Sequence, residues 1–462
     1  MPIVLPRVLH AVALAATLAA GTFALAGAAA AQNVPPAPAT APDRAALEAR
    51  RAALFAAMLR NPADLDTAFA YAEASAALGD LEAAIATLER MLIFAPGLPR
   101  VQLELAVLYY RLGAVETARD YLDAVRGQDM PDAVRARVER FSETIAREAR
   151  PYRFGGVVSA GIHAHSNANA APGGGTVIVG GVPIVLGPGA VAAPDTSVFG
   201  LARLRFAYDL PVQGTILEAD LTAYYSDYFT QNRLDLGVFE LAIGPSFNLG
   251  GIGAEGTRLG LYGIGGVVLL GGGQYSGTLG AGARLRSRID ARVSIEAGAE
   301  FRSVAYSNSA TYPTATLQDG SEVRGWLHLE GLIDNRTAAR VAFDTRFVTG
   351  ATAFRSFSEI GLSARATRQF DGPKGGLLAD DQPWSVSVAA GGLTRSFAGP
   401  DPLINPAAAQ ADTGYFVEAS LGMPLRNNFA AFLTGQYRGQ SSNYGTRAYD
   451  DAVLTLGISK RF

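Results

Sequence analysis

The sequence predicts a multidomain α+β protein, in which an α-solenoid is followed by a 14-stranded antiparallel transmembrane β-barrel. Two observations predict this fold class. Apolar residues recur every three or four positions before Pro151, the period of an amphipathic helix, and alternate with polar or small residues after it, the period of a strand. Glycine is unusually frequent, with 52 glycines among 462 residues, and helix-forming residues are concentrated in the first third of the chain. The composition therefore indicates two parts of different structural type.

The N-terminal residues predict export. Arg7 and His10 precede 21 uncharged residues that end in four alanines, so residues 1–31 are expected to be a signal peptide that is cleaved after Ala31. A retained anchor helix is the alternative, because 21 uncharged residues could span a bilayer, but a stretch dominated by alanine makes a poor anchor. Residues 32–42, rich in proline and alanine, are predicted to form an extended linker.

The segment 43–150 is predicted to be a periplasmic helical domain of the tetratricopeptide (TPR) type. A shift of 34 residues places Pro62 on Pro96 and Leu78–Gly79 on Leu112–Gly113, and 34 residues is the tetratricopeptide period. Small residues are required at the repeated sites because they let helices approach closely, while leucines fill the shared core. The predicted TPR core consists of Ala72, Leu78, Gly79, Ala84, Leu88, Ala106, Leu112, Gly113, Ala118 and Leu122.

Two clear repeats make a short solenoid whose ends need cover. Residues 43–60 before the repeats and 131–149 after them are predicted to form flanking helices that bury the exposed apolar faces. The result is a small TPR α-solenoid.

Residues 151–462 are predicted to form the barrel, from segments of roughly ten residues that alternate in polarity. In one of them Leu217 and Leu221 share a face, while Glu218 and Asp220 share the other. The fourteen predicted strands span residues 152–164, 196–208, 214–227, 233–248, 257–270, 274–287, 290–304, 321–333, 336–348, 355–370, 382–397, 412–423, 427–439 and 447–461.

Alternation alone does not decide between a soluble sandwich and a barrel with a lipid-facing outside. The exported context, a sheet too large for the available helices to cover, and aromatic residues near strand ends favour the barrel. An even number of strands places both barrel termini on one side, which is predicted to be the periplasm. Predicted outer loops such as 165–195 are long, and predicted periplasmic turns are short except for 371–381.

The last strand carries a predicted barrel-insertion signal. Leu454, Leu456, Ile458 and the terminal Phe462 share one face, which resembles the C-terminal signal by which outer-membrane barrels are recognised for insertion. Lys460 interrupts this pattern, although a lysine near the membrane interface can extend its charge into water.

The polar faces of the strands are predicted to line the lumen. Their mixed charge favours transient rather than tight contact with a passing molecule. The predicted lumen-facing residues are Arg203, Arg205, Glu218, Asp220, Arg324, His328 and Glu330.

No motif indicates catalysis, so the chain is not expected to be an enzyme or to hold a cofactor. It has no cysteine, which excludes a disulfide framework and thiolate chemistry, and its net charge of -3 gives no reason to expect nucleic acid. Gly251-x-Gly253-x-x-Gly256 matches the dinucleotide fingerprint by letter. A strand rather than a helix follows it, so a glycine-rich turn is predicted instead.

His163 and His165 are two residues apart, so they share a face of the first strand, and a metal ion could use both. No third ligand is evident in the sequence. Because a transition metal usually takes more than two protein ligands, the two histidines are interpreted as structural polar side chains near the outer mouth, and no metal site is predicted.

The loop that follows the first strand contains an apolar run, Thr176–Leu186, which is unusual for a loop in water. Two interpretations stay open. The run folds inward as a plug or serves as a contact surface for cargo or a partner, or it forms a hairpin that extends the barrel wall.

Phe154–Gly156, Ser166–Pro172 and the terminal Lys460–Phe462 resemble the first strand and the terminus of the surface lipoprotein assembly modifier (Slam) family. The signal peptide, the few TPR repeats and the barrel ending in phenylalanine resemble that family as well. The resemblance implies an outer-membrane translocator that assists export or surface display of lipoproteins or related secreted proteins. Its TPR domain would engage cargo or a chaperone in the periplasm.

The export signal, the predicted barrel, the low net charge and the resemblance together predict the location and the partners. The expected location is the outer membrane of a Gram-negative cell, with the N-terminal domain in the periplasm. The expected partners are membrane lipid, a surface lipoprotein as cargo, a periplasmic chaperone and the barrel-assembly machinery during insertion, with no nucleic acid and a monomeric state.

Two alternatives remain from other functional classes. An exopolysaccharide exporter also joins periplasmic TPR repeats to a barrel, but usually with a longer repeat array. A general porin would conduct ions and would not need repeats in front of the barrel.

Overall fold

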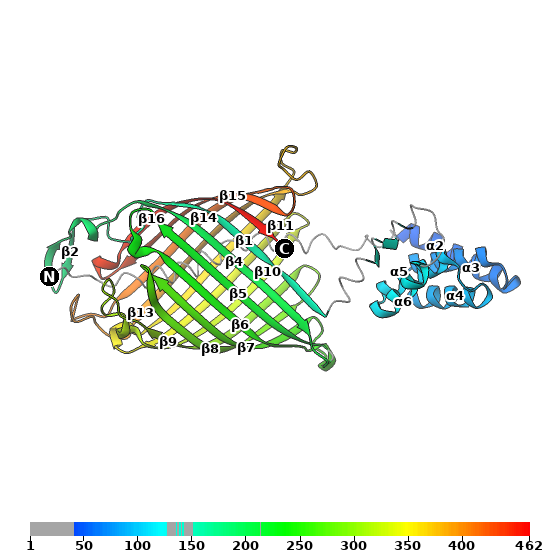
Figure 1. Ribbon diagram of the computed structural model, residues 1–462, viewed down its shortest axis with the longest axis horizontal. Coiled ribbons are helices and arrows are strands. Elements are labelled where there is room, and N and C mark those ends of the chain that lie inside the picture. The colour runs from blue at the N-terminus through cyan, green and yellow to red at the C-terminus, as the bar shows by residue number, and fades with distance from the viewer. Residues whose placement is uncertain (1–40, 127–134, 136–137, 140, 143–150, 213) are drawn as a thin grey trace. The chain divides into compact units, whose positions relative to one another are not determined.

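The computed structural model describes residues 41–126, 135, 138–139, 141–142, 151–212 and 214–462. The predicted signal peptide, most of the predicted linker and most of the predicted helix at 131–149 lie outside these residues. The chain divides into a helical unit and a barrel unit that begins at Tyr152, and each is described by itself (Figure 1).

The helical unit consists of antiparallel helices joined by short turns, as the 3.6-residue period predicts. The described helices are α2 (Ala41–Arg60), α3 (Leu65–Ala77), α4 (Leu81–Phe94), α5 (Pro99–Arg111) and α6 (Val115–Arg126). None of these helices combines the length and the apolarity needed to cross a bilayer.

Caps and turns define where the helices begin and end. The Asp64 carboxylate accepts a hydrogen bond from the backbone N–H of Thr67 at 3.1 Å and caps α3, and Asp80 caps α4 in the same way. Gly79 and Gly113 follow α3 and α5 with φ angles of 87° and 85°. Such positive φ angles favour glycine, so both helices end in a turn.

The core of the helical unit contains most of the predicted repeat residues. Ala72, Ala84, Leu88, Ala106, Ala118 and Leu122 are each at most 2% exposed. The α6 residue Leu122 packs in one cluster with Leu103 and Val138, so residues beyond α6 also contribute to this core.

Four of the predicted core residues are not core residues, and the prediction is corrected for them. Leu112 is 46% exposed and Leu78 is half-buried. Both occupy the C-cap, where the backbone turns away from the helix axis. Gly79 and Gly113 are exposed in the turns, and nothing lies within 4 Å of a Cβ added to either. Their repeat spacing therefore reflects turn geometry rather than close helix packing.

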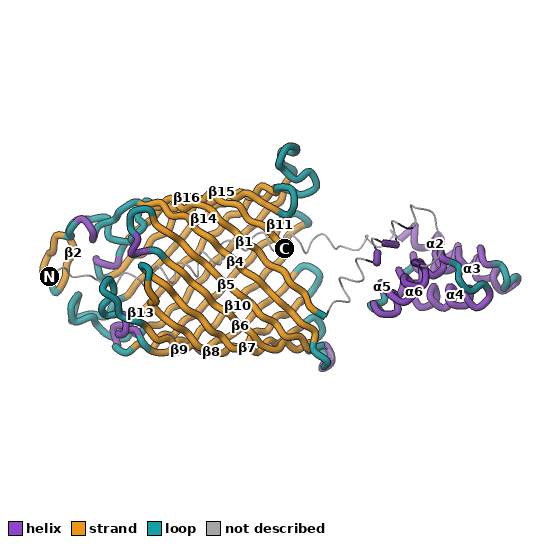
Figure 2. Tube along the Cα trace, in the orientation of Figure 1, coloured by secondary structure: helices purple, strands orange, loops and turns teal. Residues whose placement is uncertain are grey.

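The barrel confirms the predicted fold, with 14 antiparallel strands in one closed sheet (Figures 1 and 2). Every predicted strand is present, with ends that differ by at most three residues. The barrel strands are β1 (Tyr152–His165), β4 (Asp195–Asp209), β5 (Thr215–Tyr228), β6 (Leu236–Asn248), β7 (Thr257–Leu270), β8 (Gly273–Arg288), β9 (Val293–Tyr306), β10 (Gly320–Asp334), β11 (Thr337–Gly350), β12 (Phe357–Phe370), β13 (Trp384–Phe397), β14 (Ala411–Pro424), β15 (Phe429–Ser442) and β16 (Tyr449–Arg461).

Each barrel strand pairs with the next barrel strand along the chain, so that β1 pairs with β4. The first and last strands, β1 and β16, pair to close the sheet. The register places Val157 opposite Arg461 and His165 opposite Val453. The end of the barrel that contains Tyr152 and Phe462 is called the terminal end below, and the opposite end is called the loop end.

The outer surface of the barrel is apolar. Along β16, Thr455 and Ser459 are each 7% exposed, whereas the alternate residues Leu454, Leu456 and Ile458 face outward. The residues of the predicted insertion signal, Leu454, Leu456, Ile458 and Phe462, are between 53% and 57% exposed. Alternation with the apolar side outward is the surface of a membrane-spanning barrel, because a soluble barrel would bury that side.

The connections differ in length between the two ends. The connections 166–194, 307–319 and 398–410 all lie at the loop end, whereas the terminal end has short turns such as 335–336 and one longer connection, 371–383. Short 3₁₀ helices occur in several connections, at Pro188–Ala190, Asn232–Leu234, Gly250–Ile252, Ala315–Gln318, Ala353–Arg355 and Gly445–Arg447.

The apolar run in the first loop forms a separate hairpin of β2 (Thr176–Val179) and β3 (Val182–Val185), which pair only with each other. The hairpin therefore does not extend the barrel wall. It contacts the β13–β14 connection, where the Gly180 N–H donates to the Ile404 carbonyl at 2.7 Å. Val177 is buried, but Val185 is 79% exposed, so only one side of the hairpin is covered.

Candidate functional site: the charged barrel interior

Ion pairs between strands that are not neighbours identify the inner face of the barrel. Arg284 on β8 lies 3.4 Å from Glu218 on β5, three strands away. Side chains can bridge that separation only across the concave side of a closed sheet. Residues that share a strand face with Glu218 or Arg284 therefore line the interior.

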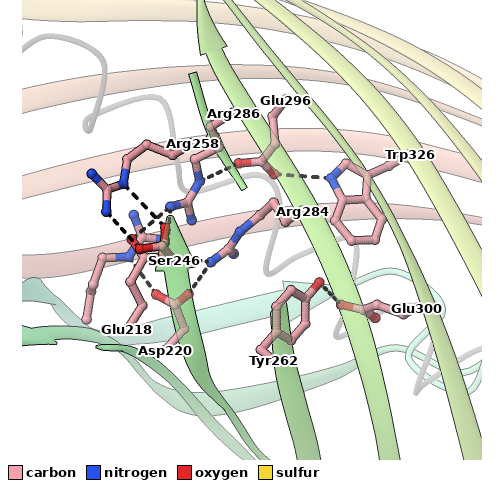
Figure 3. A network of polar contacts seen from close by, with 11 residues as sticks. Glu218, Asp220, Ser246, Arg258, Tyr262, Arg284, Arg286, Glu296, Glu300 and Trp326 are labelled. Carbon is pink, nitrogen blue, oxygen red and sulfur yellow. Dashed lines mark hydrogen bonds and ion pairs between the residues drawn. The ribbon is translucent and has the colours of Figure 1, made fainter. Parts of the chain in front are cut away.

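The first interior cluster joins two carboxylates to three arginines, and Figure 3 labels Glu218, Asp220, Arg284 and Arg286 of this cluster. Asp220 accepts from Arg205 Nε at 2.6 Å and from Arg284 Nη2 at 3.0 Å. Glu218 accepts from Arg286 Nη1 at 3.2 Å. The side chains of Glu218 and Arg284 are only 11% and 16% exposed, so these pairs are shielded more than surface pairs are.

The same cluster continues toward β10. Arg286 Nε donates to Glu296 at 3.0 Å, and the indole N–H of Trp326 donates to the same carboxylate at 3.2 Å (Figure 3). On the neighbouring strands the Tyr262 hydroxyl donates to Glu300 at 2.8 Å. Each carboxylate thus has a fixed donor, which holds the charges in a defined pattern along the wall.

A second interior cluster crosses five adjacent strands, β10 to β14. Glu322 accepts from Arg346 Nε at 2.9 Å, and Arg346 lies 3.6 Å from Glu359. Glu359 accepts from Arg395 Nε at 2.7 Å, and Arg395 lies 3.8 Å from Asp412. Opposite charges therefore alternate around this part of the wall.

The third cluster is centred on Asp451, which is 0% exposed. Its carboxylate accepts from Arg438 Nη2 at 2.6 Å, from the Asn167 backbone N–H at 2.9 Å and from the Ser166 hydroxyl at 3.3 Å. His165 Nδ1 lies 3.1 Å from it. This cluster links the closing strands β1 and β16 at the loop end.

Two predicted lumen residues on β10, Arg324 and His328, have fixed partners. Arg324 pairs with Glu322. Arg340 Nη2 lies 2.9 Å from His328 Nδ1 and can only donate, so His328 Nε2 carries the proton and donates to Asp344 at 3.1 Å. His328 is thus part of a hydrogen-bonded network with both ring nitrogens satisfied.

The remaining predicted lumen residues lie on the same strand faces. Arg203 is two residues from Arg205 on β4, and Glu330 is exposed and stands opposite Arg340 in the β10–β11 register. Several interior charges were missed by the sequence prediction, although some of them, such as Glu240, Glu296 and Glu300, have apolar neighbours on both sides in their strands. The missed residues are Glu240, Arg284, Arg286, Glu296, Glu300, Arg302, Glu322, Arg346, Glu359, Arg365, Arg395, Asp412, Glu418, Arg438 and Asp451.

An apolar cluster packs the β9–β10 connection against inward-facing residues of the strands. The β9–β10 connection contributes Tyr312, whose hydroxyl donates to the Arg233 carbonyl at 2.6 Å, and Gln318, which donates to the Tyr275 hydroxyl at 2.9 Å. Burial raises the pKa of Tyr312 to about 12, so its hydroxyl stays a donor. The cluster comprises Phe199, Leu201, Tyr224, Leu236, Val268, Leu270, Tyr275, Tyr312, Ala315 and Phe432.

One family model matches the chain, a tetratricopeptide repeat over residues 76–138. The model covers α4, α5 and α6, which confirms the predicted repeat in the helical unit. A search of curated proteins finds no match.

Several solved structures resemble parts of the chain. The type III secretion translocator chaperone SycD of Yersinia enterocolitica covers 22% of this chain, and 74% of SycD is covered, at 17% identity and a TM-score of 0.22. The match to the outer membrane channel DcaP of Acinetobacter baumannii covers 67% of this chain and 97% of the DcaP chain, at 9% identity and a TM-score of 0.37. The match to a bacterial polysaccharide outer membrane secretin covers 66% of this chain and 98% of the secretin chain, at 10% identity and a TM-score of 0.32.

The fold and the interior together define a class of protein. The chain joins tetratricopeptide-repeat helices to a closed 14-stranded barrel with an apolar outside and a charged inside. The matches assign the tetratricopeptide repeat to residues 76–138. They do not identify a particular protein or a family for the whole chain.

Proposed function

We propose that this chain is an outer-membrane translocator of the surface lipoprotein assembly modifier type, which assists export or surface display of lipoproteins or related secreted proteins. The observation that carries the proposal is the union of a repeat domain with a barrel whose interior is charged. Repeat domains form concave surfaces that bind peptides, and a closed barrel offers a polar route across a bilayer.

The connectivity supports delivery at one mouth of the barrel. The helical unit precedes β1 in the chain, β1 begins at Tyr152, and the Phe462 N–H donates to the Gly156 carbonyl at 3.1 Å at the same end of the barrel. Cargo held by the repeats is therefore tethered to the terminal end. In this proposal the terminal end faces the periplasm and the loop end faces the exterior.

The interior is suited to transient contact. Arginines and carboxylates alternate along the wall, as in the pairs of Arg284 with Asp220 and of Arg395 with Glu359. A passing polypeptide can exchange charged partners with such a wall without binding one place tightly. No cofactor is needed for this role.

Deletion of the gene in its own host tests the proposal. Surface proteins are labelled by protease shaving, and cells carry the wild-type chain, no chain, or the chain without residues 43–150. We expect at least one surface lipoprotein to become protected from protease without the chain, and its exposure to return only with the full chain. Unchanged display of every surface lipoprotein contradicts the proposal.

The charged interior also favours one alternative, a solute channel. Planar-bilayer recording on the purified full chain separates the two functions. A gated translocator is expected to show rare or no steady conductance, whereas a porin shows steady conductance whether or not the TPR domain is present.

A further inference from the structure

His163 and His165 on β1 each have one ring nitrogen bound and one buried without a partner. His163 Nδ1 lies 2.7 Å from the Thr455 hydroxyl, and His165 Nδ1 lies 3.1 Å from Asp451. The two residues are 4% and 5% exposed, and neither Nε2 atom has a hydrogen-bond partner. A buried polar atom without a partner costs free energy, so each Nε2 atom is expected to bind a water molecule or an ion.

Asp451 fixes the tautomer of His165. The carboxylate accepts from Arg438, from the Asn167 N–H and from the Ser166 hydroxyl, which keeps it ionised. An ionised carboxylate can only accept, so His165 Nδ1 carries the proton and Nε2 carries the lone pair. A histidine that donates one ring N–H to a carboxylate and offers the other nitrogen is the usual arrangement around a bound metal ion.

The spacing of the two rings fits one shared ion. Their centroids lie 5.8 Å apart with the planes inclined by 59°. Two imidazoles that share an ion with Zn–N bonds of about 2.0–2.1 Å place their ring centres roughly 5–6 Å apart. The ring of His163 is also held by stacking on Phe199, at a centroid distance of 4.1 Å.

Ser197 supplies an oxygen next to the two rings. It stands opposite His163 in the β1–β4 register, it is 0% exposed, and its hydroxyl has no hydrogen-bond partner. Among the described residues, no group of three or more His, Cys, Asp or Glu side chains could hold a metal ion. A site here therefore uses two imidazoles, with the serine hydroxyl or water completing the coordination.

We propose that His163 and His165 bind one divalent transition-metal ion of the Zn²⁺ or Cu²⁺ type through their Nε2 atoms, inside the barrel at its loop end. Imidazole nitrogens are preferred ligands of these ions. The site lies on the closing strands, because its ligands are on β1 and their partners Thr455 and Asp451 are on β16. The inference is independent of the translocator proposal.

The charges around the site set its expected strength. The positive charge of Arg438, which lies 2.6 Å from Asp451, opposes that of the ion, while the carboxylate of Asp451 offsets it. Replacing the arginine by an uncharged donor, Arg438→Gln, is therefore expected to tighten metal binding. If the site holds only water, Arg438→Gln is expected to leave metal binding unchanged.

Metal titration of the purified full chain tests the proposal. The chain is refolded in detergent with a histidine-free affinity tag, stripped with a chelator, and titrated with Zn²⁺ by calorimetry and with Cu²⁺ by electron paramagnetic resonance. We expect one ion per chain and nitrogen hyperfine splitting. Removing a hydrogen-bond partner of a metal ligand lowers the affinity roughly 10–100-fold. His163→Gln and His165→Gln each remove a ligand itself, so each is expected to lower the affinity by more than that.

The matched control is His328→Gln, because both ring nitrogens of His328 already have partners. It is expected to bind the ion like the unmodified chain. The heat-dependent shift on a denaturing gel shows that each variant has a folded barrel, and Zn²⁺ is expected to raise the unfolding temperature of the unmodified chain but not of His165→Gln. No binding by the folded unmodified chain, or an equal loss in His328→Gln, overturns the proposal.

Discussion

Gly161 on β1 and Gly457 on β16 stand directly opposite each other in the strand pair that closes the barrel. Each glycine is covered by an aromatic ring from the next strand. A Cβ on Gly161 would lie 2.9 Å from the Phe199 ring, and a Cβ on Gly457 would lie 2.5 Å from the Phe432 ring. The closing pair therefore depends on two positions that leave no room for a side chain.

Gly161→Ala is predicted to weaken closure of the barrel. Its Cβ would also lie 2.7 Å from the Gly457 Cα, which is backbone and cannot move without shifting the strand. Overpacking of this kind costs roughly 1–3 kcal/mol. Thermal unfolding in detergent measures it. The control is Gly200→Ala on the neighbouring β4, where nothing lies within 4 Å of the added Cβ, and equal unfolding temperatures for the two variants contradict the prediction.

Glu218→Gln is predicted to destabilise the barrel, because Arg284 and Arg286 each lose one of their two carboxylate partners. We expect a loss of roughly 1–3 kcal/mol, below the full cost of breaking a buried pair because each arginine keeps a second carboxylate. Urea unfolding of the detergent-refolded chain gives the value. Glu330→Gln, at an exposed position of the interior face, serves as the control and is expected to change little.

Sequence periodicity predicts the elements because it is local. The alternation of Leu217 with Glu218 and Asp220 already assigns the two faces of β5, and all fourteen strands follow from such patterns. The partners within the interior are not local. Arg284 meets Glu218 only because the sheet closes with a particular stagger, which no single strand encodes.

Loop contacts and the burial of helix-cap residues are likewise not predicted by local sequence patterns. The apolar run at Thr176–Leu186 predicts an unusual loop, but its contact with Ile404 depends on a connection more than two hundred residues away. Leu112 has the repeat spacing of a core residue and is nevertheless exposed, because a 34-residue period marks equivalent positions and not their burial.

Leu122→Ala is predicted to destabilise the helical unit far more than Leu112→Ala. Leu122 is 1% exposed and Leu112 is 46% exposed. Truncation of a buried leucine costs about 2–5 kcal/mol, whereas an exposed substitution is usually within about 0.5 kcal/mol. The free energies of unfolding of the two variants are compared by following the helical circular dichroism signal of the full chain in urea. Equal losses would show that α6 does not pack as described.

The helical unit is predicted to lose stability at high pH through Tyr109. Its hydroxyl donates to Glu89 at 2.6 Å, and this contact raises the pKa of Tyr109 from 10.0 to about 12. A raised folded pKa means that the contribution is complete below about pH 10 and is lost as the pH rises through about 12. Tyrosinate absorbance and helical signal are followed together. Tyr109→Phe lacks this titration, and an unchanged pH profile in that variant contradicts the assignment.

The most direct test of the account is the environment of alternate residues on β16. The chain has no cysteine, so single cysteines at Leu454, Leu456 and Ile458, and at Thr455 and Ser459, can carry a spin label in proteoliposomes of the full chain. We predict that the first three labels are accessible to lipid-soluble oxygen and the last two to a water-soluble nickel chelate. Labels that are all equally accessible to the nickel chelate would contradict a barrel with lipid outside and water within.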